Sequence, residues 1–326
     1  MLKNPHMLIE GMILCSYACR IETGYNYLRG EFHDLNVIME KAMEDAYAKG
    51  YLGKNILGSG FNFDLYTHLG AGAYICGEES ALLNSLEGER GEPRMKPPFP
   101  AVEGLYAKPT VVNNVETLCV VPYIVNEGAE KYASLGTEKS KGTKLVSVSG
   151  HVKKPGNYEV VLGTPIREII YDLAGGIRDG NKLKAFIPGG SSVPMLPADQ
   201  VDVSYDYESL AAAGTMLGSG AMIVIDDSVN IVETTLRLIS FYMHESCGKC
   251  TPCREGTRWL YQIVEKIMQN KGQLDYIEKM EDICDNMNMK AFCPLADACV
   301  SPVVSSIKYF RSDYEEYFKN VPVGSV

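Results

Sequence analysis

The chain has 326 residues, of which 46% are hydrophobic and 22% are charged. This length and composition are typical of a globular protein with two or three separately packed cores, and they exclude a disordered or fibrous chain. The net charge is −10, and Lys and Arg are scattered along the chain, which excludes nucleic acid as a main partner. No apolar run reaches the roughly 18–20 residues of a membrane helix.

Ten cysteines stand out in this composition. The amino terminus lacks the pattern of a secretory signal, so we expect a cytoplasmic protein. In a reducing compartment, clustered thiols hold metals more often than they form disulfides.

The first stretch predicts alternating helices and strands. We expect a first helix over Pro5–Arg20, a strand over Gly24–Leu28 and a second helix over Leu35–Lys49. A further strand over Phe63–Tyr66 leads to a glycine-rich turn that opens the helix Glu78–Leu86. This order predicts an α/β layer with a partly parallel sheet. A loop rich in proline and glycine follows over residues 90–110, and helix resumes near Val115.

The middle of the chain predicts a small β-grasp module. Two alternating runs, Lys144–Gly150 and Gly156–Val161, give a hairpin signal, and they precede a helix over Thr164–Leu173 and a strand over Lys184–Ile187. Beyond Asp227 the strand signals fade. Four helices forming a bundle are predicted there, over Val229–His244, Arg254–Gln269, Leu274–Met287 and Pro302–Phe318.

Three cysteines at intervals of three, Cys247, Cys250 and Cys253, carry the strongest chemical signal. A tight loop can point these thiols at neighbouring corners of one cube. A C-x₂-C-x₂-C run with one remote cysteine suits a [4Fe–4S] cluster, whereas structural zinc more often uses two pairs of ligands. We therefore expect a cluster, with zinc and unligated thiols as alternatives.

The fourth ligand must come from elsewhere in the chain. We expect Cys293, because it follows a predicted helix and precedes Pro294, which fixes the backbone. Cys299 is the alternative, and Cys284 on a helix face is expected in the core of the bundle. Three cations close to the run either tune the reduction potential of the cluster or form a solvated face: Lys249, Arg254 and Arg258.

The glycine-rich turn is a weaker signal. Gly70, Gly72 and Gly77 do not match G-x-G-x-x-G, because Ile75 stands at the third glycine. At the helix start that follows, Glu78 and Glu79 either accept hydrogen bonds from a ribose or nicotinamide or complement the helix dipole.

Two further segments could contribute to a ligand site. Lys96 and Phe99, in a proline-rich turn, would place a cation and an aromatic face beside an adenine or phosphate. Val112, Asn113 and Asn114 offer amide groups to a heterocycle or phosphate, although either asparagine could simply cap the following helix.

Taken together, five motifs resemble those of one family. They are Gly70-Ala-Gly-Ala-Tyr-Ile-Cys-Gly-Glu-Glu79, Lys96-Pro-Pro-Phe-Pro100, Val112-Asn-Asn-Val-Glu-Thr117, Pro188-Gly-Gly-Ser191 and Glu245-Ser-Cys-Gly-Lys-Cys-Thr-Pro-Cys-Arg-Glu255. Their order and spacing resemble the 51-kilodalton flavoprotein, the bacterial F subunit, of NADH:quinone oxidoreductase, which is respiratory complex I. Flavoprotein subunits of NAD-linked hydrogenases and formate dehydrogenases share the same motifs.

The resemblance implies three domains. Residues 1–136 would be the C-terminal part of a Rossmann-like α/β domain for FMN and NADH, residues 137–226 a β-grasp (SLBB-like) domain, and residues 227–326 a helical bundle with a [4Fe–4S] cluster. The family's glycine-rich FMN loop and its Asn-x-Asp-Glu segment lie upstream of Met1. We therefore expect the chain to lack the N-terminal part of the first domain.

The resemblance also assigns binding residues. Tyr74, Gly77, Glu78, Asn113 and Asn114 would contact FMN, with Val112 in the same segment. Glu79, Lys96 and Phe99 would hold NADH, with the Phe99 ring near the adenine. The four cluster ligands would be Cys247, Cys250, Cys253 and Cys293. No side chain is expected to act as a catalytic acid, base or nucleophile, because the cofactors carry the chemistry.

The implied function is the NADH dehydrogenase module of complex I, which passes a hydride from NADH to FMN and single electrons to the cluster. Its partners would be a thioredoxin-like [2Fe–2S] protein (the E-type subunit) and a large iron–sulfur protein (the G-type subunit). They would hold it on the inner face of the cell membrane. The alternatives are a diaphorase of an NAD-linked hydrogenase or formate dehydrogenase, and a flavin-free electron-relay or assembly fragment.

Overall fold

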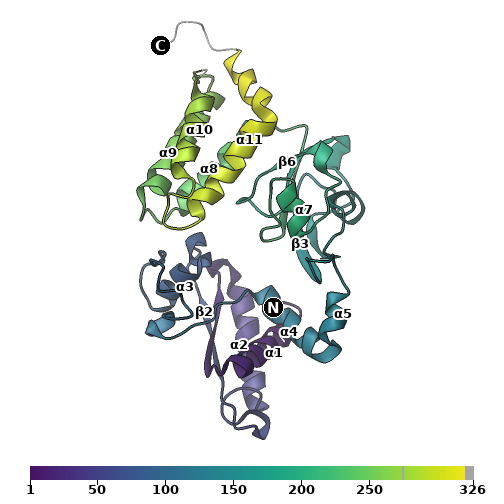
Figure 1. Cartoon of the computed structure of the whole chain (residues 1–326), viewed down its shortest axis with the longest axis vertical. Coiled ribbons are helices and arrows are strands. Elements are labelled where there is room, and N and C mark those ends of the chain that lie inside the picture. The colour runs from purple at the N-terminus through teal and green to yellow at the C-terminus, as the bar shows by residue number, and fades with distance from the viewer. Residues whose placement is uncertain (274, 320–326) are drawn as a thin grey trace. The chain divides into compact units, whose positions relative to one another are not determined.

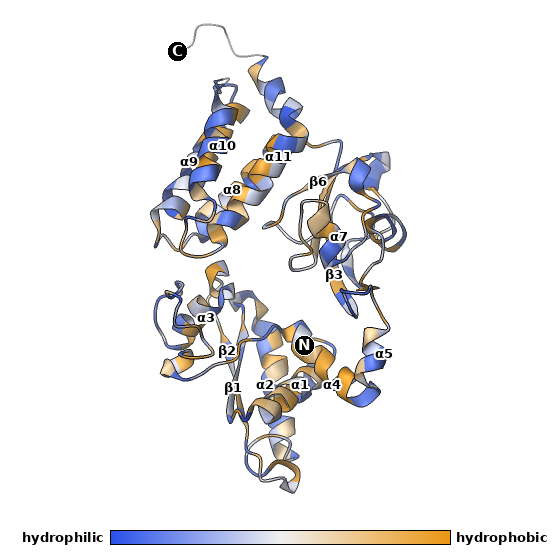
Figure 2. Cartoon of the chain, in the orientation of Figure 1, coloured by the Kyte–Doolittle hydropathy of each residue, from blue (hydrophilic) through white to orange (hydrophobic). Residues whose placement is uncertain are grey.

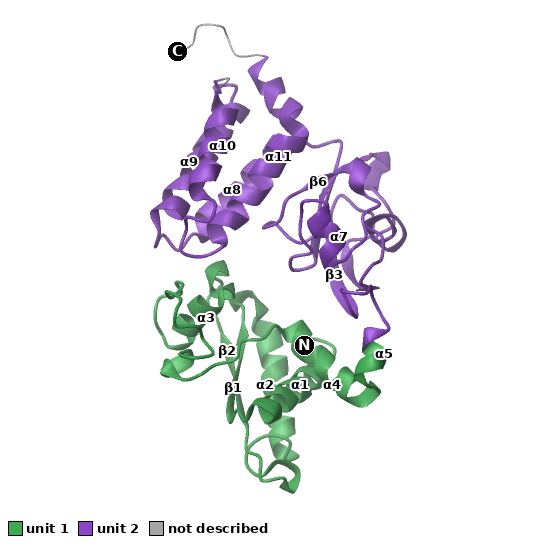
Figure 3. Ribbon diagram, in the orientation of Figure 1, with its two compact units in different colours: residues 1–132 green, residues 133–326 purple. Residues whose placement is uncertain are grey.

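The computed structural model describes residues 1–273 and 275–319 (Figure 1). The chain divides into two units, Met1–Tyr132 and Ala133–Val326 (Figure 3). The unit boundary falls within α5 (Ala129–Ala133). Among the described residues, no helix is both long and apolar enough to cross a lipid bilayer.

The first unit packs helices around a parallel pair of strands. Strand β1 (Thr23–Leu28) pairs with β2 (Asp64–Leu69). Parallel strands need a long crossover, which here contains α2 (His33–Ala48). The unit also contains α1 (Pro5–Cys19), α3 (Glu79–Leu86), α4 (Val115–Glu127) and the short 3₁₀ turns η1 (Gly30–Phe32), η2 (Ile56–Gly58), η3 (Tyr74–Gly77) and η4 (Leu105–Ala107).

Local chemistry explains where α1 begins and ends. The Asn4 side chain accepts a hydrogen bond from the Met7 N–H at 3.2 Å, and Pro5 stands at the first helical position. Arg20 closes the helix in the left-handed region, with φ of 57°. The expected helix Pro5–Arg20 is thus confirmed to within one residue.

Gly11 is the point of closest approach between α1 and α4. A Cβ atom at Gly11 would lie 2.0 Å from the backbone oxygen of Leu118. The apolar core around this contact includes Leu8, Met39 and Phe63, none of which is exposed. Because the obstructing atom is backbone, α4 would have to move to admit a side chain.

We expect Gly11→Ala to lower the free energy of unfolding of the first unit. Alanine normally favours a helix over glycine, yet overpacking costs about 1–3 kcal/mol, and we expect overpacking to dominate. Urea denaturation followed by far-UV circular dichroism measures the effect. Gly156→Ala, on a strand of the second unit, is a control, because its Cβ would make only ordinary contact, at 3.6 Å, with the Tyr158 hydroxyl. An unchanged or raised stability of Gly11→Ala would contradict the proposed close packing.

The second unit begins with a five-stranded mixed sheet. Its strands, in spatial order, are β4 (Gly156–Val161), β3 (Thr143–Gly150), β7 (Ala221–Asp226), β5 (Leu183–Ile187) and β6 (Leu196–Pro197). Strands β3 and β4 form an antiparallel hairpin, and β7 runs parallel to β3. The sheet residues buried in the core include Val146, Phe186 and Val224.

One element of this sheet region differs from the expected helix Thr164–Leu173. The chain forms one α-helical turn, α6 (Ile166–Glu168), and then the π-helical turn η5 (Ile169–Leu173). The wider turn coincides with full burial of Ile169 and Ile170. Two further short helices follow, η6 (Arg178–Gly180) and η7 (Ala198–Gln200). Helix α7 (Tyr207–Ala212) then precedes β7 in the chain.

The second unit ends in four helices, α8 (Ile231–Glu245), α9 (Thr251–Met268), α10 (Tyr276–Met287) and α11 (Leu295–Phe318). Figure 2 shows both hydrophobic and hydrophilic residues on these helices, as expected of helices that bury one face. The predicted fold class, α/β with a β-grasp module and a helical bundle, is confirmed.

The third and fourth helices of the bundle are predicted to begin at Leu274 and Pro302. Leu274, the predicted start of the third helix, lies outside the described residues, as do residues 320–326. The expected start of the last helix at Pro302 is wrong, because α11 begins at Leu295 and includes Pro302. Burial of Leu295, Ala296 and Cys299 continues the helical pattern upstream of the proline.

The buried carboxylate of Asp226 organises the connection from the sheet to the bundle. Its oxygens accept hydrogen bonds from Asn181 Nδ2 at 2.9 Å and from the Ser228 N–H at 3.1 Å. His151 Nδ1 lies 2.8 Å from Oδ1. Burial alone would raise the pKa of Asp226, but the bonds from Asn181 and Ser228 and the nearby His151 lower it to about 2.

The second unit should therefore lose stability in acid. A folded-state pKa of about 2, below the ordinary 3.8, gives stability that is present above pH 3.8 and lost as the pH falls towards 2. This difference corresponds to about 2 kcal/mol. Urea midpoints measured from pH 6 to pH 2 test this expectation. Asp226→Asn should flatten the acid limb, and an unchanged slope in that variant would contradict the assignment.

Candidate functional site

The Cys247–Cys253 run occupies the turn between α8 and α9. Cys247 and Cys250 precede α9 and are partly exposed, whereas Cys253 lies in the first turn of α9 and is buried. Gly248 has φ of 77°, in the left-handed region that favours glycine. Its carbonyl accepts a hydrogen bond of 2.7 Å from Arg254 Nη1, which holds the turn against the helix.

Cys293 reaches the same place from the connection between α10 and α11. Burial raises the pKa of Cys253 to about 11, with smaller contributions from Cys250, Cys293 and Cys247 in that order, although a hydrogen bond with Ser246 lowers it. Because such charge effects act over short distances, the four thiols lie in one neighbourhood. Their roles as cluster ligands stay a prediction.

The donor set of this site consists of four cysteine thiols. Within residues 1–273 and 275–319, no group of three His, Cys, Asp or Glu side chains is placed to hold one metal ion. A [4Fe–4S] cluster binds each of its four thiolates to a different iron, so its ligands lie farther apart than those of one zinc ion. The donor set therefore fits a cluster.

The two other cysteines of the bundle occupy its core. Cys284 on α10 is 1% exposed, and Cys299 on α11 is fully buried. Burial raises the pKa of the Cys284 thiol to about 12 and that of Cys299 well above its ordinary value. Cys299 lies inside a helix rather than in a loop, which leaves Cys293 as the thiol on the accessible connection.

A cation–π contact joins the two cysteine-bearing segments. Lys249 Nζ, between Cys247 and Cys250, lies 4.7 Å from the centroid of the Phe292 ring, next to Cys293. Arg254 instead pairs with Glu255 at 3.0 Å and bonds the turn. Two of the three predicted cations thus hold the turn, and Arg258 is exposed one helical turn further along α9.

We expect Phe292→Ala to loosen the connection that carries Cys293. An exposed cation–π contact contributes about 0.5–1 kcal/mol, so the cluster should be lost several-fold faster. Iron release to a chelator, followed by absorbance after anaerobic preparation, measures the rate. Phe292→Tyr keeps the ring and should behave as the native chain. Equal rates for all three proteins would show that the contact does not secure the connection.

The acidic residues after the glycine turn form a compact polar cluster. Glu78 caps α3, with Oε2 accepting from the Ser80 N–H at 3.0 Å and the Ala81 N–H at 2.9 Å. Lys96 Nζ lies 3.0 Å from Glu78 Oε1 and 2.5 Å from Glu79 Oε1. Of the two interpretations of Glu78, the helix-terminus role is therefore observed.

These contacts favour the charged forms of Glu78 and Lys96. Burial opposes ionisation of Glu78, but hydrogen bonds from Ser80, Lys96 and Ala81 lower its pKa overall. For Lys96, burial lowers the pKa, while Glu79 and Glu78 raise it by more. The structure thus brings together Glu78, Glu79 and Lys96, which the sequence had only placed in two separate motifs.

The other residues predicted to bind FMN or NADH lie before α3, at the start of α4 and in the loops between these helices. Tyr74 and Gly77 form the turn η3 directly before α3, and the Tyr74 ring is 42% exposed. Phe99 is 58% exposed. Asn114 caps α4 by accepting from the Glu116 N–H at 2.8 Å, so one of the two asparagines is a helix cap, as the sequence allowed.

Val112 and Asn113 instead line a cavity of 170 Å³ beside β1. Ligand pockets are typically about 300–1,000 Å³, so this cavity by itself is too small for a whole flavin nucleotide and would hold part of one. Its lining also includes Cys15, Tyr25 and Tyr27, which the sequence did not indicate. Tyr25 and Tyr27 lie on one face of β1. Their spacing of two residues in a predicted strand is the sequence feature that could have indicated this shared face.

Comparison with known proteins identifies the class of these units. The description "Nuo51 FMN-binding domain" matches residues 1–123, "SLBB domain" matches residues 145–196, and "NADH-ubiquinone oxidoreductase-F iron-sulfur binding region" matches residues 233–317. The fold and sites are therefore those of an oxidoreductase subunit with an FMN-binding domain and a [4Fe–4S] region.

Curated relatives identify the family. The chain is 53% identical over 314 residues to the NADH-quinone oxidoreductase F subunit of Streptomyces coelicolor, and this match covers 96% of the chain and 70% of the relative. It is 52% identical, with the same coverage, to the corresponding F subunit of Mycobacterium tuberculosis. The chain belongs to the family of NADH-quinone oxidoreductase F subunits, and the predicted resemblance is confirmed.

A solved structure supports the same fold. An NAD⁺-reducing [NiFe]-hydrogenase in the H₂-reduced state matches with a TM-score of 0.88 and 35% identity over 97% of the chain. The chain spans about half, 52%, of the length of that hydrogenase chain.

Proposed function

We propose that the chain is the part of a complex I flavoprotein that binds NADH and relays its electrons. FMN, when bound, accepts a hydride from NADH and returns the two electrons singly to the [4Fe–4S] cluster. The observation that carries the proposal is the convergence of four thiols, from the turn before α9 and the connection before α11, around the buried Cys253.

The protein's own part is to bind and orient. Cys247, Cys250, Cys253 and Cys293 hold the cluster. We assign FMN to Tyr74, Gly77, Glu78, Val112, Asn113 and Asn114, and NADH to Glu79, Lys96 and Phe99. The support for these assignments is the ion-paired group at the start of α3, the exposed rings of Tyr74 and Phe99, and the cavity at Val112 and Asn113.

The partners follow from this proposal. An adjoining thioredoxin-like [2Fe–2S] subunit and a larger iron–sulfur subunit would accept the electrons, and they would hold the chain at the inner face of the cell membrane. The second candidate is the diaphorase of an NAD-linked hydrogenase or formate dehydrogenase. The solved hydrogenase favours it through the fold, yet its 35% identity is well below the 53% shared with a quinone oxidoreductase subunit.

Anaerobically purified protein tests the proposal directly. We expect four irons per chain without zinc, FMN released on denaturation, and NADH-dependent reduction of ferricyanide. Iron without flavin and without turnover would instead support a flavin-free relay or assembly fragment. Zinc in place of iron would overturn the redox assignment.

Two cysteine variants identify the fourth ligand. Cys293→Ser should lose the absorbance and electron paramagnetic resonance signal of the cluster, because a fully liganded [4Fe–4S] cluster needs four thiolates. Cys299→Ala is the control, since it keeps a small apolar side chain at a buried position, and it should retain the cluster. The opposite result would exchange the roles of the two residues.

A further inference from the structure

A second cavity lies in the β-grasp part of the second unit, and its lining includes no residue assigned to FMN, NADH or the cluster. Its volume is 580 Å³, within the range of about 300–1,000 Å³ that is typical of small-molecule sites. Three cations line it, Lys153, Arg167 and Lys182, and the described residues of its lining include no carboxylate. In a chain of net charge −10, this concentration of positive charge needs an explanation.

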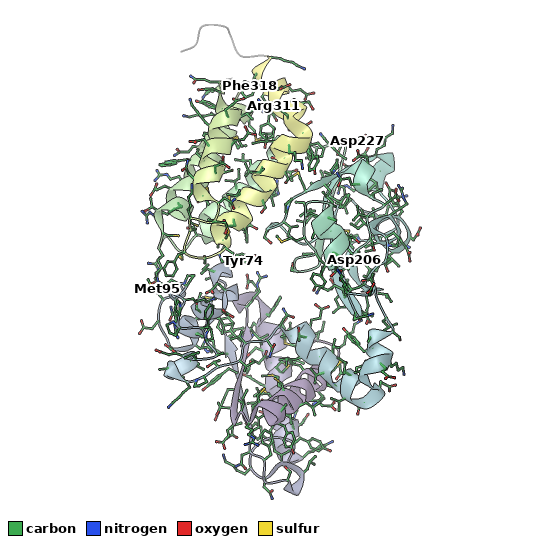
Figure 4. All side chains as sticks on the ribbon, viewed as in Figure 1. Tyr74, Met95, Asp206, Asp227, Arg311 and Phe318 are labelled. Carbon is green, nitrogen blue, oxygen red and sulfur yellow. The ribbon has the colours of Figure 1, made fainter. Side chains whose placement is uncertain are left out.

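The backbone fixes each of the two lysines. The Lys153 N–H donates to the Gly176 carbonyl at 2.9 Å, which holds the lysine beside a glycine pair that also lines the cavity. The Lys182 N–H donates to Asp227 Oδ1 at 3.0 Å, and the Asp227 N–H returns a bond of 3.0 Å to the Lys182 carbonyl. Figure 4 labels Asp227, which directly follows β7.

The third cation is held by its side chain. Arg167 donates from Nε and Nη2 to the two carboxylate oxygens of Asp202, at 2.5 and 2.9 Å. Its guanidinium carbon lies 5.8 Å from the centroid of the Tyr171 ring, which also lines the cavity. Asp202 therefore neutralises and orients Arg167, so the uncompensated positive charge of the cavity comes from the lysines.

Lys153 and Lys182 are both exposed, and neither makes an ion pair within the part of the chain that the structure describes. Ammonium groups without a carboxylate partner favour an anionic ligand, and phosphate groups accept several charge-assisted hydrogen bonds at once. The glycines at 175 and 176 have φ of 75° and 83°, so the turn between the lysines presents backbone without side chains.

We propose that this cavity binds a small soluble compound bearing two or more phosphate groups. The lysines bind the phosphates, while Arg167 and Tyr171 form a fixed wall. The site goes beyond electron transfer from NADH, because the cavity shares no residue with the flavin, nicotinamide or cluster sites.

Isothermal titration with inorganic pyrophosphate tests the site on the full chain, at low ionic strength and with excess FMN and NAD⁺ to occupy the first unit. We expect one pyrophosphate per chain. K153Q/K182Q should weaken its binding about tenfold or more, because both charge-assisted contacts are lost. K139Q/K141Q is the matched control, since it removes two exposed lysines of the same unit that lie outside the cavity and should change nothing.

The possible outcomes separate this site from the electron-transfer function. No binding to the native chain, unchanged binding to K153Q/K182Q, or equal weakening by K139Q/K141Q would each overturn the phosphate site. Iron content, flavin content and ferricyanide reduction should be the same in all three proteins. Failure of those assays in the native chain would overturn the electron-transfer function and leave the phosphate site untouched.

Discussion

The second unit depends on one geometric requirement, which is that four thiols from two distant segments meet at one end of a helical bundle. Three of the thiols come from a single tight turn, but α9 and α10 separate Cys293 from that turn in the sequence. The packing of α9 against α10 therefore determines whether Cys293 lies close to the other three thiols. Gly256 on α9 leaves space for the Met287 side chain at the end of α10, because a Cβ at Gly256 would lie 2.4 Å from Met287 Sδ. The end of α10 can therefore approach the cysteine turn closely.

Buried polar contacts tie this bundle to the β-grasp sheet. Lys184 Nζ on β5 lies 2.6 Å from Asp313 Oδ2 on α11, and the same carboxylate oxygen accepts from the Ile231 N–H at the start of α8. The Ser305 hydroxyl of α11 accepts from the Met195 N–H at 3.0 Å. Removing either charge of the Lys184–Asp313 pair would leave the other partly buried without its ion-pair partner, which is destabilising. The cluster-bearing helices are thus held against the sheet as one body.

The sequence predicted elements with strong local signals and missed those fixed by tertiary contacts. The C-x₂-C-x₂-C run and the helices around it follow from spacing and periodicity alone. The π-helical turn at Ile169–Leu173 does not, because it coincides with the burial of two adjacent isoleucines. Pro302 illustrates the same limit, since a proline usually ends a helix, yet burial of the preceding turn continues α11 through it. The ion-paired group at α3 was predicted only as separate motifs, because no local rule brings Lys96 to Glu78.

The contacts of Glu78, Glu79 and Lys96 also suggest a separate role for each of the three residues. Glu78 uses one carboxylate oxygen for the helix terminus and the other for Lys96, and its side chain is only 14% exposed. It therefore positions the helix and the lysine, in addition to the contact with FMN that is proposed for it. Glu79 is 40% exposed and Lys96 29%, and Lys96 has donors beyond those that two carboxylates use. A nucleotide bound at this place would meet Glu79 and Lys96 first, with Glu78 fixing both the helix and the lysine from behind.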